Sequence, residues 1–459
     1  MKARETSLFY WKKVRFFVHK CDTLFYVRKI EAERKGEKMF FEEEYDRHLA
    51  LATDLWEHPE LGFKEHYTRQ RILDYLTEVT PDLEVRTFAH TGIRVDLNHG
   101  KDHTMVFLAE MDSVYSPAHW QADPETGAAQ ACGHFTQVTI ALSIYRYYVQ
   151  TEAYKQLDFN VAFIFVPAEE YVDLDYRRQL RDQGELVYLG GKAEAMREGV
   201  FDDVDFVYHL HALGEEHERP IIEVACDLAG FCYKYFTFKG KASHAGLDPF
   251  SGINAYSMST LFNTALGLSR QQMREDKYLR INPVLFGENT MTTNVIPHEV
   301  KIGTDIRSMS LDYMKEISKR LDQMAKGSAQ ALGGEVVCET EMGYLPFIQD
   351  DYLTKLVKEA FEADDTIPDI IDDRGAIAAA GDIGDLSFMV PSIQISYGGF
   401  EGRIHGADFK MVDPEFVLST LPAFLVKSIQ HISDNVDYRQ FYHRSFQEYA
   451  KVIADMMDN

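Results

Sequence analysis

Four short segments carry side chains of the kinds that bind metal ions or transfer protons. One joins a thiol to an imidazole, a second has two adjacent carboxylates, and the other two contain histidines. Thiolate, imidazole and carboxylate are the ligand types that zinc and similar divalent ions take in proteins. A neighbouring carboxylate that faces a water or a substrate can move protons. The residues are Cys132 with His134, Glu169 with Glu170, His209 with His211, and His405.

Each segment also has an ordinary explanation when it is taken alone. Cys132 and His134 cannot share a helix face, although a turn loosened by Gly133 would let them converge, and such pairs often arise by chance. Two adjacent acids can be a solvated helix start that the helix dipole favours. Lone histidines and glycine-rich turns are common without any function. The coincidence of all four segments is what favours a site.

The apolar runs around these segments explain how they would meet. Residues 104–109, 160–166, 206–210 and 392–397 read as buried strands, and residues 136–150 and 191–198 read as helices between them. This alternation predicts an α/β fold with a mainly parallel sheet and helices on both faces. The carboxyl ends of parallel strands share one edge, where such folds bind ligands. The candidate segments follow these strands, so the site is predicted at that edge.

A second pattern interrupts the first between residues 228 and 340. Strands and helices follow one another there in the order β-α-β-β-α-β, which is the ferredoxin-like arrangement. The sequence therefore predicts a small α+β unit inserted into a larger α/β one. The expected division is a basic extension (1–38), a first catalytic part (39–227), the inserted unit (228–340) and a second catalytic part with C-terminal helices (341–459).

Composition narrows the classes of partner. The 459 residues carry a net charge of −25, although the first 38 carry 11 Lys and Arg against 5 Asp and Glu. So negative a chain repels nucleic acid and anionic membranes, and no apolar run approaches the ~20 residues of a membrane span. Five scattered cysteines make no disulfide framework, so we expect a reducing, cytoplasmic location.

The order of the segments, with several others, resembles metallopeptidase family 20, the aminoacylase, hippurate-hydrolase and carboxypeptidase group. The likeness covers residues 42–430 and is closest to the N-acyl amino acid amidohydrolase branch. Residues 380–385 are also similar to the aminobenzoyl-glutamate hydrolase subgroup. The matching motifs are His58–Phe63, Glu110–Asp112, Cys132–His134, Pro167–Glu170, Gly190–Lys192, Leu210-His211, Gly240–Ala245, Asn294–Pro297, Gly303–Arg307 and His405.

This resemblance implies a catalytic unit with two divalent metal ions, manganese or zinc, and a smaller lid formed by the inserted unit. It implies Glu169 as general base, and His244, Asn294 and Arg307 as residues that contact the substrate from the lid. In some members the lid histidine serves a neighbouring subunit, which implies a homodimer through the lid. The implied metal ligands are Cys132, His134, Glu170, His211 and His405.

One segment departs from the family pattern. The branch usually continues Cys-Gly-His-Asp-Gly-His, whereas Phe135-Thr136-Gln137 follow His134 in this chain. The resemblance does not make these positions metal ligands, so the site can survive. Their change alters the surroundings that orient ligands and tune metal affinity. Metal occupancy and substrate choice are the properties that this departure puts in question.

The expected function is a metal-dependent amidohydrolase that cleaves the amide bond of an N-acyl amino acid, or of a related substrate such as aminobenzoyl-glutamate, with a metal-activated water. A dipeptidase or carboxypeptidase would activate water in the same way, so that alternative stays open. A catalytically silent binding subunit also stays open, because of the changed segment after His134. A cysteine hydrolase using Cys132 and His134 is disfavoured, since residues two apart would need an unusual turn and no orienting acid is evident.

Overall fold

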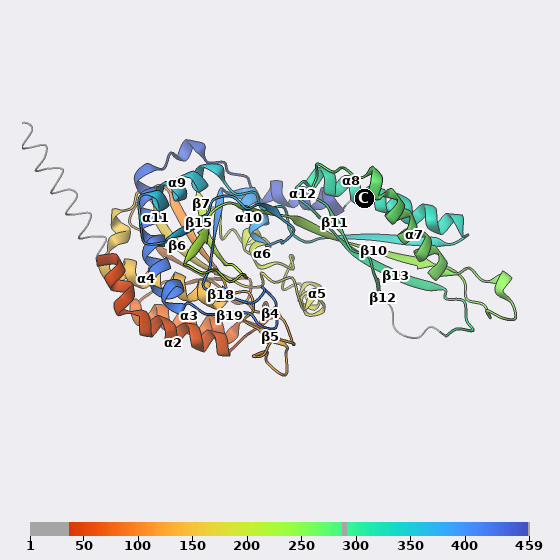
Figure 1. Cartoon of the computed structure of the whole chain (residues 1–459), viewed down its shortest axis with the longest axis horizontal. Helices are drawn as coiled ribbons and strands as arrows, with labels where there is room; N and C mark the ends of the chain where they lie inside the picture. The colour runs from red at the N-terminus through yellow and green to blue at the C-terminus, as the bar shows by residue number, and fades with distance from the viewer. Residues whose placement is uncertain (1–35, 287–291, 458–459) are drawn as a thin grey trace, which may run out of the picture.

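The protein is described by a computed structural model over residues 36–286 and 292–457. The basic extension predicted for residues 1–38 lies almost wholly outside this range. Figure 1 shows a larger body and an elongated second unit beside it, each built on its own sheet. We call residues 230–342, which form the second sheet and its two helices, the inserted unit.

The sheet of the larger body has eight strands and is parallel at its centre. The four central strands β6, β3, β7 and β17 pair in parallel, while β1, β2 and β8 make the antiparallel pairings towards the edges. In spatial order the strands are β1 (Arg86–Phe88), β2 (Gly92–Leu97), β6 (Asn160–Val166), β3 (Thr104–Glu110), β7 (Phe206–Ala212), β17 (Ser392–Tyr397), β8 (Ile221–Glu223) and β15 (Asp369–Ile371).

Helices cover both faces of this sheet, as predicted. Side chains alternate along a strand, so Phe107 of β3 belongs to one apolar core and its neighbour Leu108 belongs to another. Burial on both faces explains why the central strands read as continuous apolar runs. The first core includes residues of α2 (Tyr45–Glu57), α3 (His66–Val79), α4 (His134–Thr151), α9 (Asp351–Glu362) and α11 (Leu421–Asn435); the second includes residues of α6 (Gly191–Arg197), α10 (Ile383–Met389) and α12 (Phe446–Met457).

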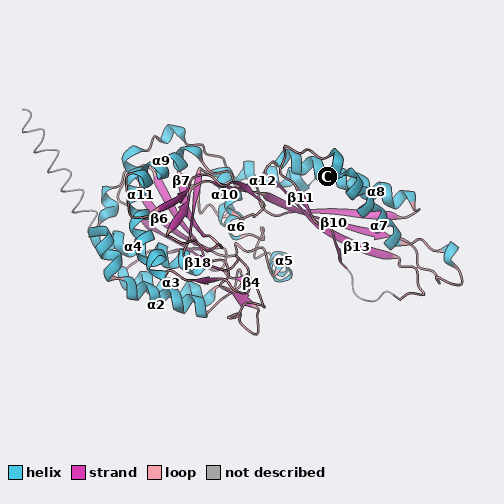
Figure 2. Ribbon diagram, in the orientation of Figure 1, coloured by secondary structure: helices cyan, strands magenta, loops and turns pink. Residues whose placement is uncertain are grey.

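The inserted unit has the predicted ferredoxin-like order. Its sheet runs β14-β10-β13 and then β11 and β12, with every neighbouring pair antiparallel and with the second strand of the pattern split in two. Figure 2 shows the helices α7 and α8 on one side of this sheet. The elements are β10 (Gly230–Lys239), α7 (Ala255–Ser269), β11 (Arg280–Ile281), β12 (Val284–Phe286), β13 (Glu299–Ser308), α8 (Leu311–Ala331) and β14 (Glu335–Met342).

Several contacts join the inserted unit to the larger body. The C-terminal helix α12 packs against both α10 of the body and β14 of the inserted unit. On α5 (Leu174–Asp182), the Nη2 atom of Arg178 lies 2.9 Å from the carboxylate of Glu341 in β14. These contacts lie near the end of the inserted unit where its chain enters and leaves the body. None of the helices within residues 36–286 and 292–457 is long and apolar enough to cross a membrane.

Candidate active site

The predicted metal ligands come together at the carboxyl edge of the parallel strands. Glu170 follows β6, His211 lies near the end of β7, and His405 follows β17 and the short strand β18 (Phe400–Glu401). Cys132 precedes α4 and His134 is the first residue of that helix. The turn between them depends on Gly133, whose φ of +89° is left-handed and whose Cβ, if it had one, would lie 2.6 Å from that of Ala212.

Two clusters of donor atoms meet at the Cys132 thiol. In each cluster the possible ligand atoms lie within 4.8 Å of one another. Cys132 Sγ is 3.5 Å from His211 Nε2, and His405 Nε2 is 2.9 Å from Glu170 Oε1. One cluster contains Cys132, His134 and His211, and the other contains Cys132, Glu170 and His405. The geometry therefore unites all five residues that the sequence predicted as metal ligands.

Ring orientation also suits these donors. The Nδ1 atom of His134 lies 2.8 Å from the carbonyl oxygen of Asp112, and that of His211 lies 2.8 Å from the carbonyl oxygen of Ala212. Such contacts fix a ring and leave Nε2 as the free coordinating atom. His134 Nε2 and Glu170 Oε1 are both buried and lack a hydrogen bond of good geometry with the described residues, although His134 Nε2 lies 3.1 Å from Glu110 Oε2 and Glu170 Oε1 lies 2.9 Å from His405 Nε2. Buried polar atoms of this kind need a partner, and a cation satisfies both.

Electrostatics favour the thiolate that metal binding requires. Burial and the Glu170 carboxylate raise the pKa of the Cys132 thiol, but His134 and His211 outweigh them and lower it to about 6. Burial lowers the pKa of His405, yet its contacts with Cys132 and Glu170 raise that pKa to about 11. The donors thus hold protons between negative groups. A divalent cation can take the place of those protons, because it binds thiolate and neutral imidazole.

The two adjacent carboxylates sit on a tightly held turn, residues 167–170, which we call the catalytic turn. Ala168 has a φ of +55°, a strained value for a residue with a Cβ. Its N–H donates to Glu65 Oε1 at 2.8 Å. The N–H groups of Glu169 and Glu170 donate to the two carboxylate oxygens of Asp112 at 3.1 and 3.0 Å. Three consecutive backbone donors are therefore fixed by two buried acids.

The carbonyl groups of the same turn are held from the other side. Arg177 on α5 is fully buried and its guanidinium donates to the carbonyl oxygens of Ala168, at 3.2 Å, and of Glu170. The Tyr344 hydroxyl donates to the carbonyl oxygen of Glu169. Arg177 also reaches Leu189 O at 2.7 Å, so it ties the turn to the start of α6. The strain at the turn persists because its surroundings fix it so completely.

Glu169 lies buried beside the donor clusters and has a shifted pKa. Its carboxylate is buried and lies 3.9 Å from His134 Nε2. Burial, with the nearby Glu110 and Glu170 carboxylates, raises the pKa of Glu169 well above its usual value. A raised pKa is the usual tuning of a carboxylate that serves as a general base near neutral pH.

A buried ionic network underlies the clusters. The Glu110 carboxylate accepts from Lys192 Nζ at 2.6 Å and from Gln137 Nε2 at 2.9 Å, and it lies 3.2 Å from His209 Nε2. Lys192 also contacts Asp382. His209, one of the sequence candidates, therefore belongs to this network and not to either cluster. Gln137, which replaces the histidine usual in the family, is a partner of Glu110 that also accepts from the Glu110 N–H at 3.1 Å.

The three residues predicted to contact substrate from the inserted unit are not gathered at the clusters. His244 and Asn294 are exposed and lie on neighbouring chain segments, where Ala245 N donates to Asn294 O at 2.9 Å. These segments follow β10 and precede β13, and residues 240–254 lie at the outer end of the inserted unit (Figure 1). Arg307 lies 2.6 Å from Asp305 and donates to the carbonyl oxygen of Ala378 at 2.8 Å, so it secures the segment before α10.

Sequence reasoning missed most residues that hold the catalytic turn. Asp112 stood in a matching motif, as did Lys192 of the network around Glu110, but nothing in the sequence gave either of them a role. Glu65, Arg177 and Tyr344 have no distinguishing pattern, because they reach the turn from separate parts of the chain. Their unusual burial is a property of the fold, which the residue types alone do not reveal.

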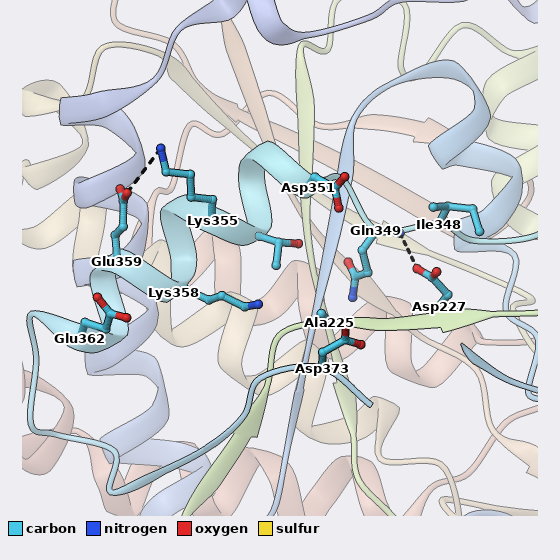
Figure 3. A pocket seen from close by; sticks show the side chains of 11 residues that line it. Ala225, Asp227, Ile348, Gln349, Asp351, Lys355, Lys358, Glu359, Glu362 and Asp373 are labelled. Carbon is cyan, nitrogen blue, oxygen red and sulfur yellow. Dashed lines mark hydrogen bonds and ion pairs between the residues drawn. The ribbon is translucent and has the colours of Figure 1, made fainter. Parts of the chain in front are cut away.

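Two pockets differ in their relation to the clusters. One cavity of about 260 Å³ is lined by Glu169 and His211 and so opens onto the site. Another, of about 540 Å³, lies against α9 (Figure 3) and is lined by several carboxylates and two lysines. Among the described residues that line this second pocket there is no histidine or cysteine. The chemistry predicted from the sequence therefore belongs to the smaller cavity.

Comparison with known proteins agrees with this site. The sequence pattern of Peptidase family M20/M25/M40 matches residues 106–427. N-acetyldiaminopimelate deacetylase of Streptococcus uberis is 28% identical over 338 residues, which cover 70% of this chain and 82% of the relative. The enzyme of that name from Lactococcus lactis subsp. cremoris is 26% identical and covers 82% of this chain and 97% of the relative.

Solved structures share the fold. A dinuclear metal-binding peptidase of the M20 family from Bacillus subtilis superposes with a TM-score of 0.67 at 18% identity, covering 86% of this chain and all of the other. The aminobenzoyl-glutamate utilization protein of Klebsiella pneumoniae gives a TM-score of 0.61 at 16% identity, covering 86% and 97%. The family pattern spans most of the chain, and the donor clusters and the sheet fit it. The chain belongs to peptidase family M20/M25/M40 and is a metal-dependent hydrolase that acts on amide bonds.

Proposed function

We propose that this chain is an amidohydrolase that releases an amino acid from a small N-acyl amino acid. The observation that carries the proposal is the convergence of two donor clusters at Cys132 beside the buried carboxylate of Glu169. Glu169 also lies in a third group of possible donors, with Glu110 and His134, and we assign it proton transfer instead of metal binding. The names of the deacetylase relatives support an acyl amino acid as substrate, with N-acetyldiaminopimelate as the first compound to try. These relatives are only 28% and 26% identical to this chain, so the identity of the acyl group and of the amino acid is proposed here and is not taken from them.

The donor set fits two divalent metal ions, with zinc or manganese as the candidates. Cys132, His134 and His211 would hold one ion, and Glu170 and His405 the other, with the Cys132 thiol between them. Thiolate and imidazole favour zinc, whereas the carboxylate also suits manganese. Ions bound there would supply Lewis acidity, which polarises the amide carbonyl and acidifies water.

The residues of the catalytic turn would carry out the proton transfers. Glu169 would take a proton from the attacking water at a carboxylate oxygen and later deliver it to the leaving amine. Its raised pKa suits both steps, because the group must hold the proton between them. The cage of Glu65, Asp112, Arg177 and Tyr344 would keep Glu169 in position while Glu170 faces the other way, towards His405. Holding a catalytic group in place in advance is a large part of enzymatic rate enhancement.

We also infer that the inserted unit, predicted as residues 228–340, serves as a lid and as the contact of a homodimer. His244 and Asn294 would then act on the substrate, either by closure or in the site of the second subunit. The inserted unit exposes large apolar side chains, as expected of a surface covered in a dimer. Leu268 is 75% exposed on α7, and the edge strand β12 has Val284, Leu285 and Phe286 about half exposed.

A reducing location such as the cytoplasm is proposed on the basis of the cysteines. The four cysteines within the described residues, Cys132, Cys226, Cys232 and Cys338, are all unpaired. The proposed role of Cys132 needs its thiolate, which oxidation would remove. Activity that is lost under mild oxidation and regained with a thiol reductant would agree with this location.

Hydrolysis of a small substrate panel tests the proposed function. Purified enzyme, treated with a chelator and then restored with zinc or manganese, would be given N-acetyl amino acids, aminobenzoyl-glutamate and dipeptides. We expect metal-dependent release of amino acids from the N-acetyl compounds. Hydrolysis of dipeptides alone would favour a peptidase, and no metal-dependent hydrolysis of any compound would contradict an amidohydrolase.

A further inference from the structure

The cavity that opens onto the site contains a second group of charges. Besides Glu169 and His211, it is lined by Arg374 and by the two carboxylates of Glu215 and Glu223. Glu223 is nearly fully buried on β8, and its carboxylate contacts Arg374 Nε. Arg374 Nη1 lies 3.5 Å from Glu215 Oε1, and three-quarters of the Arg374 side chain is buried. Within residues 36–286 and 292–457, no hydrogen bond or ion pair joins this charged group to the five proposed ligands.

Most of the other side chains that form the wall of this cavity are apolar. A cavity of about 260 Å³ is smaller than the roughly 300–1,000 Å³ of pockets that take drug-sized ligands, so it suits a short chain of atoms. An aliphatic chain could cross this wall and place a polar end at Arg374. The apolar lining residues are Leu213, Leu228, Ile377, Ile383 and Ile404.

The charges of Arg374, Glu215 and Glu223 determine which polar group of a substrate can bind beside them. One guanidinium faces two carboxylates, so the group has an excess of negative charge and attracts a cation. The guanidinium has donors to spare, since Arg has five N–H groups, and these suit a carboxylate. A substrate end that carries an ammonium and a carboxylate would pair the ammonium with the carboxylates of this group and the carboxylate with the Arg374 guanidinium.

We propose that this cavity binds the far end of the substrate, and that this end carries an ammonium group beside a carboxylate, held by Glu223 and Arg374. The substrate class is thus an N-acyl amino acid whose side chain ends in a second amino acid head group. This inference rests on the proposed function for the reaction itself. It adds the residues that choose the substrate, since neither Arg374 nor Glu223 stood among the sequence candidates.

Calorimetric titration of the zinc-loaded Glu169→Gln enzyme, which would bind without turnover, tests the proposal. Four ligands differ only in the charges at the end that is not acylated, and we call them the charge ladder. N-acetyldiaminopimelate has an ammonium and a carboxylate at that end, and Nα-acetyl-lysine lacks this carboxylate. N-acetyl-2-aminopimelate lacks the ammonium, and N-acetylnorleucine lacks both groups. Because a hydrogen bond to a charged group contributes about 1.5–3 kcal/mol, each missing charge should weaken Kd about 10-fold or more. Equal Kd values for the four ligands would overturn the proposal, without any substitution in the cavity.

Two substitutions assign the charges to residues. Arg374→Leu should remove the advantage of N-acetyldiaminopimelate over Nα-acetyl-lysine, and Glu223→Gln should remove its advantage over N-acetyl-2-aminopimelate. Arg439→Leu removes an arginine of an exposed pair with Asp437 and should leave the whole ladder intact. If either cavity variant weakened all four ligands alike, Arg374 and Glu223 would be structural and the proposal wrong.

The wild-type enzyme separates this proposal from the proposed function. Hydrolysis of N-acetylnorleucine, which has no charge to recognise, tests the amide chemistry alone. If binding followed the charge ladder while no ligand was hydrolysed, the cavity assignment would stand and the amidohydrolase function would fail. If all four ligands were hydrolysed with equal kcat/KM, the opposite would hold.

Discussion

The catalytic turn and the outer end of the inserted unit differ in how firmly the fold holds them. The turn is buried, and its backbone is bonded by Glu65, Asp112, Arg177 and Tyr344. The segments with His244 and Asn294 are exposed, and next to them Leu247 and Phe250 are 78% and 86% exposed. The turn is thus fixed within one chain, whereas His244 and Asn294, the residues implied in substrate contact, lie exposed on the inserted unit.

This difference indicates that the two regions have separate roles, catalysis at the turn and substrate capture at the outer end of the inserted unit. Groups that bind a cation or move a proton must be held within a fraction of an ångström, and a buried cage achieves that. Residues that approach only after the substrate has entered must remain movable or come from another subunit. Breaking the cage should therefore reduce turnover, whereas changing the outer end should affect substrate capture and assembly.

The largest effect is expected at the proton-transfer group. Glu169→Gln keeps the shape of the side chain but removes its basicity, so kcat should fall about 10²–10⁴-fold. Metal content measured by atomic emission should stay the same, because Glu169 is not among the proposed ligands. Near-normal turnover with bound metal would show that another group moves the proton.

Mixing two inactive variants tests whether the outer end acts between subunits. His244→Ala alone should lose most activity. If His244 serves the partner's site, subunit exchange with Glu169→Gln restores one complete site in each mixed dimer, and random pairing gives about a quarter of the wild-type activity. Closure within one chain predicts no recovery from a mixture in which native mass spectrometry detects the mixed dimers.

The cage around the turn is tested at Arg177. Arg177→Met leaves the Ala168 and Glu170 carbonyl oxygens without their buried donor, so kcat should fall about 10-fold while KM changes little, and unfolding free energy should fall by about 2–4 kcal/mol. Arg177→Lys should recover part of kcat, because one donor remains. The neighbouring Arg178→Met is the matched control, since it removes a partly exposed pair with Glu341; equal kcat losses in both would rule out a specific role for Arg177.

The smallest effect is expected at Gln137, which contacts Glu110 in the ionic network next to the donor clusters. Gln137→Leu removes both contacts with Glu110 and leaves the ligands in place, so metal affinity should weaken about 10-fold. Chelator competition measures this change directly. Gln137→His, which restores the residue usual in the family, is the informative companion, and unchanged affinity in both variants would show that the network below the ligands does not tune the metal.

The sequence predicted the elements that carry the site better than the edges of the sheet. The run Asn160–Val166 and the run Ser392–Tyr397 are strands with the predicted bounds, because burial on both faces makes them continuously apolar. The short strands β1, β8 and β15 gave no such signal, since they are only three residues long. The antiparallel edges of the sheet therefore became visible only in the structure.

The proposed metal ligands could be predicted from the sequence, whereas the buried charged residues around them could not. The five proposed ligands are chemically distinctive residue types: Glu170 and His405 follow strands, His211 lies near a strand end, and Cys132 and His134 stand at the start of a helix. Arg177 reads as one charge on an ordinary amphipathic helix, and Glu223 and Arg374 read as surface charges. Only the packing of distant segments buries them, and one sequence does not contain that information.

The number of metal ions per chain tests the central claim most directly. Quantitative metal analysis of the purified enzyme after saturation with zinc should give about two ions per chain, and Cys132→Ala should lower this number, because both donor clusters share that thiol. Glu169→Gln should keep about two ions. A wild-type chain that holds no metal, or a Cys132→Ala chain that holds as much as the wild type, would contradict the account.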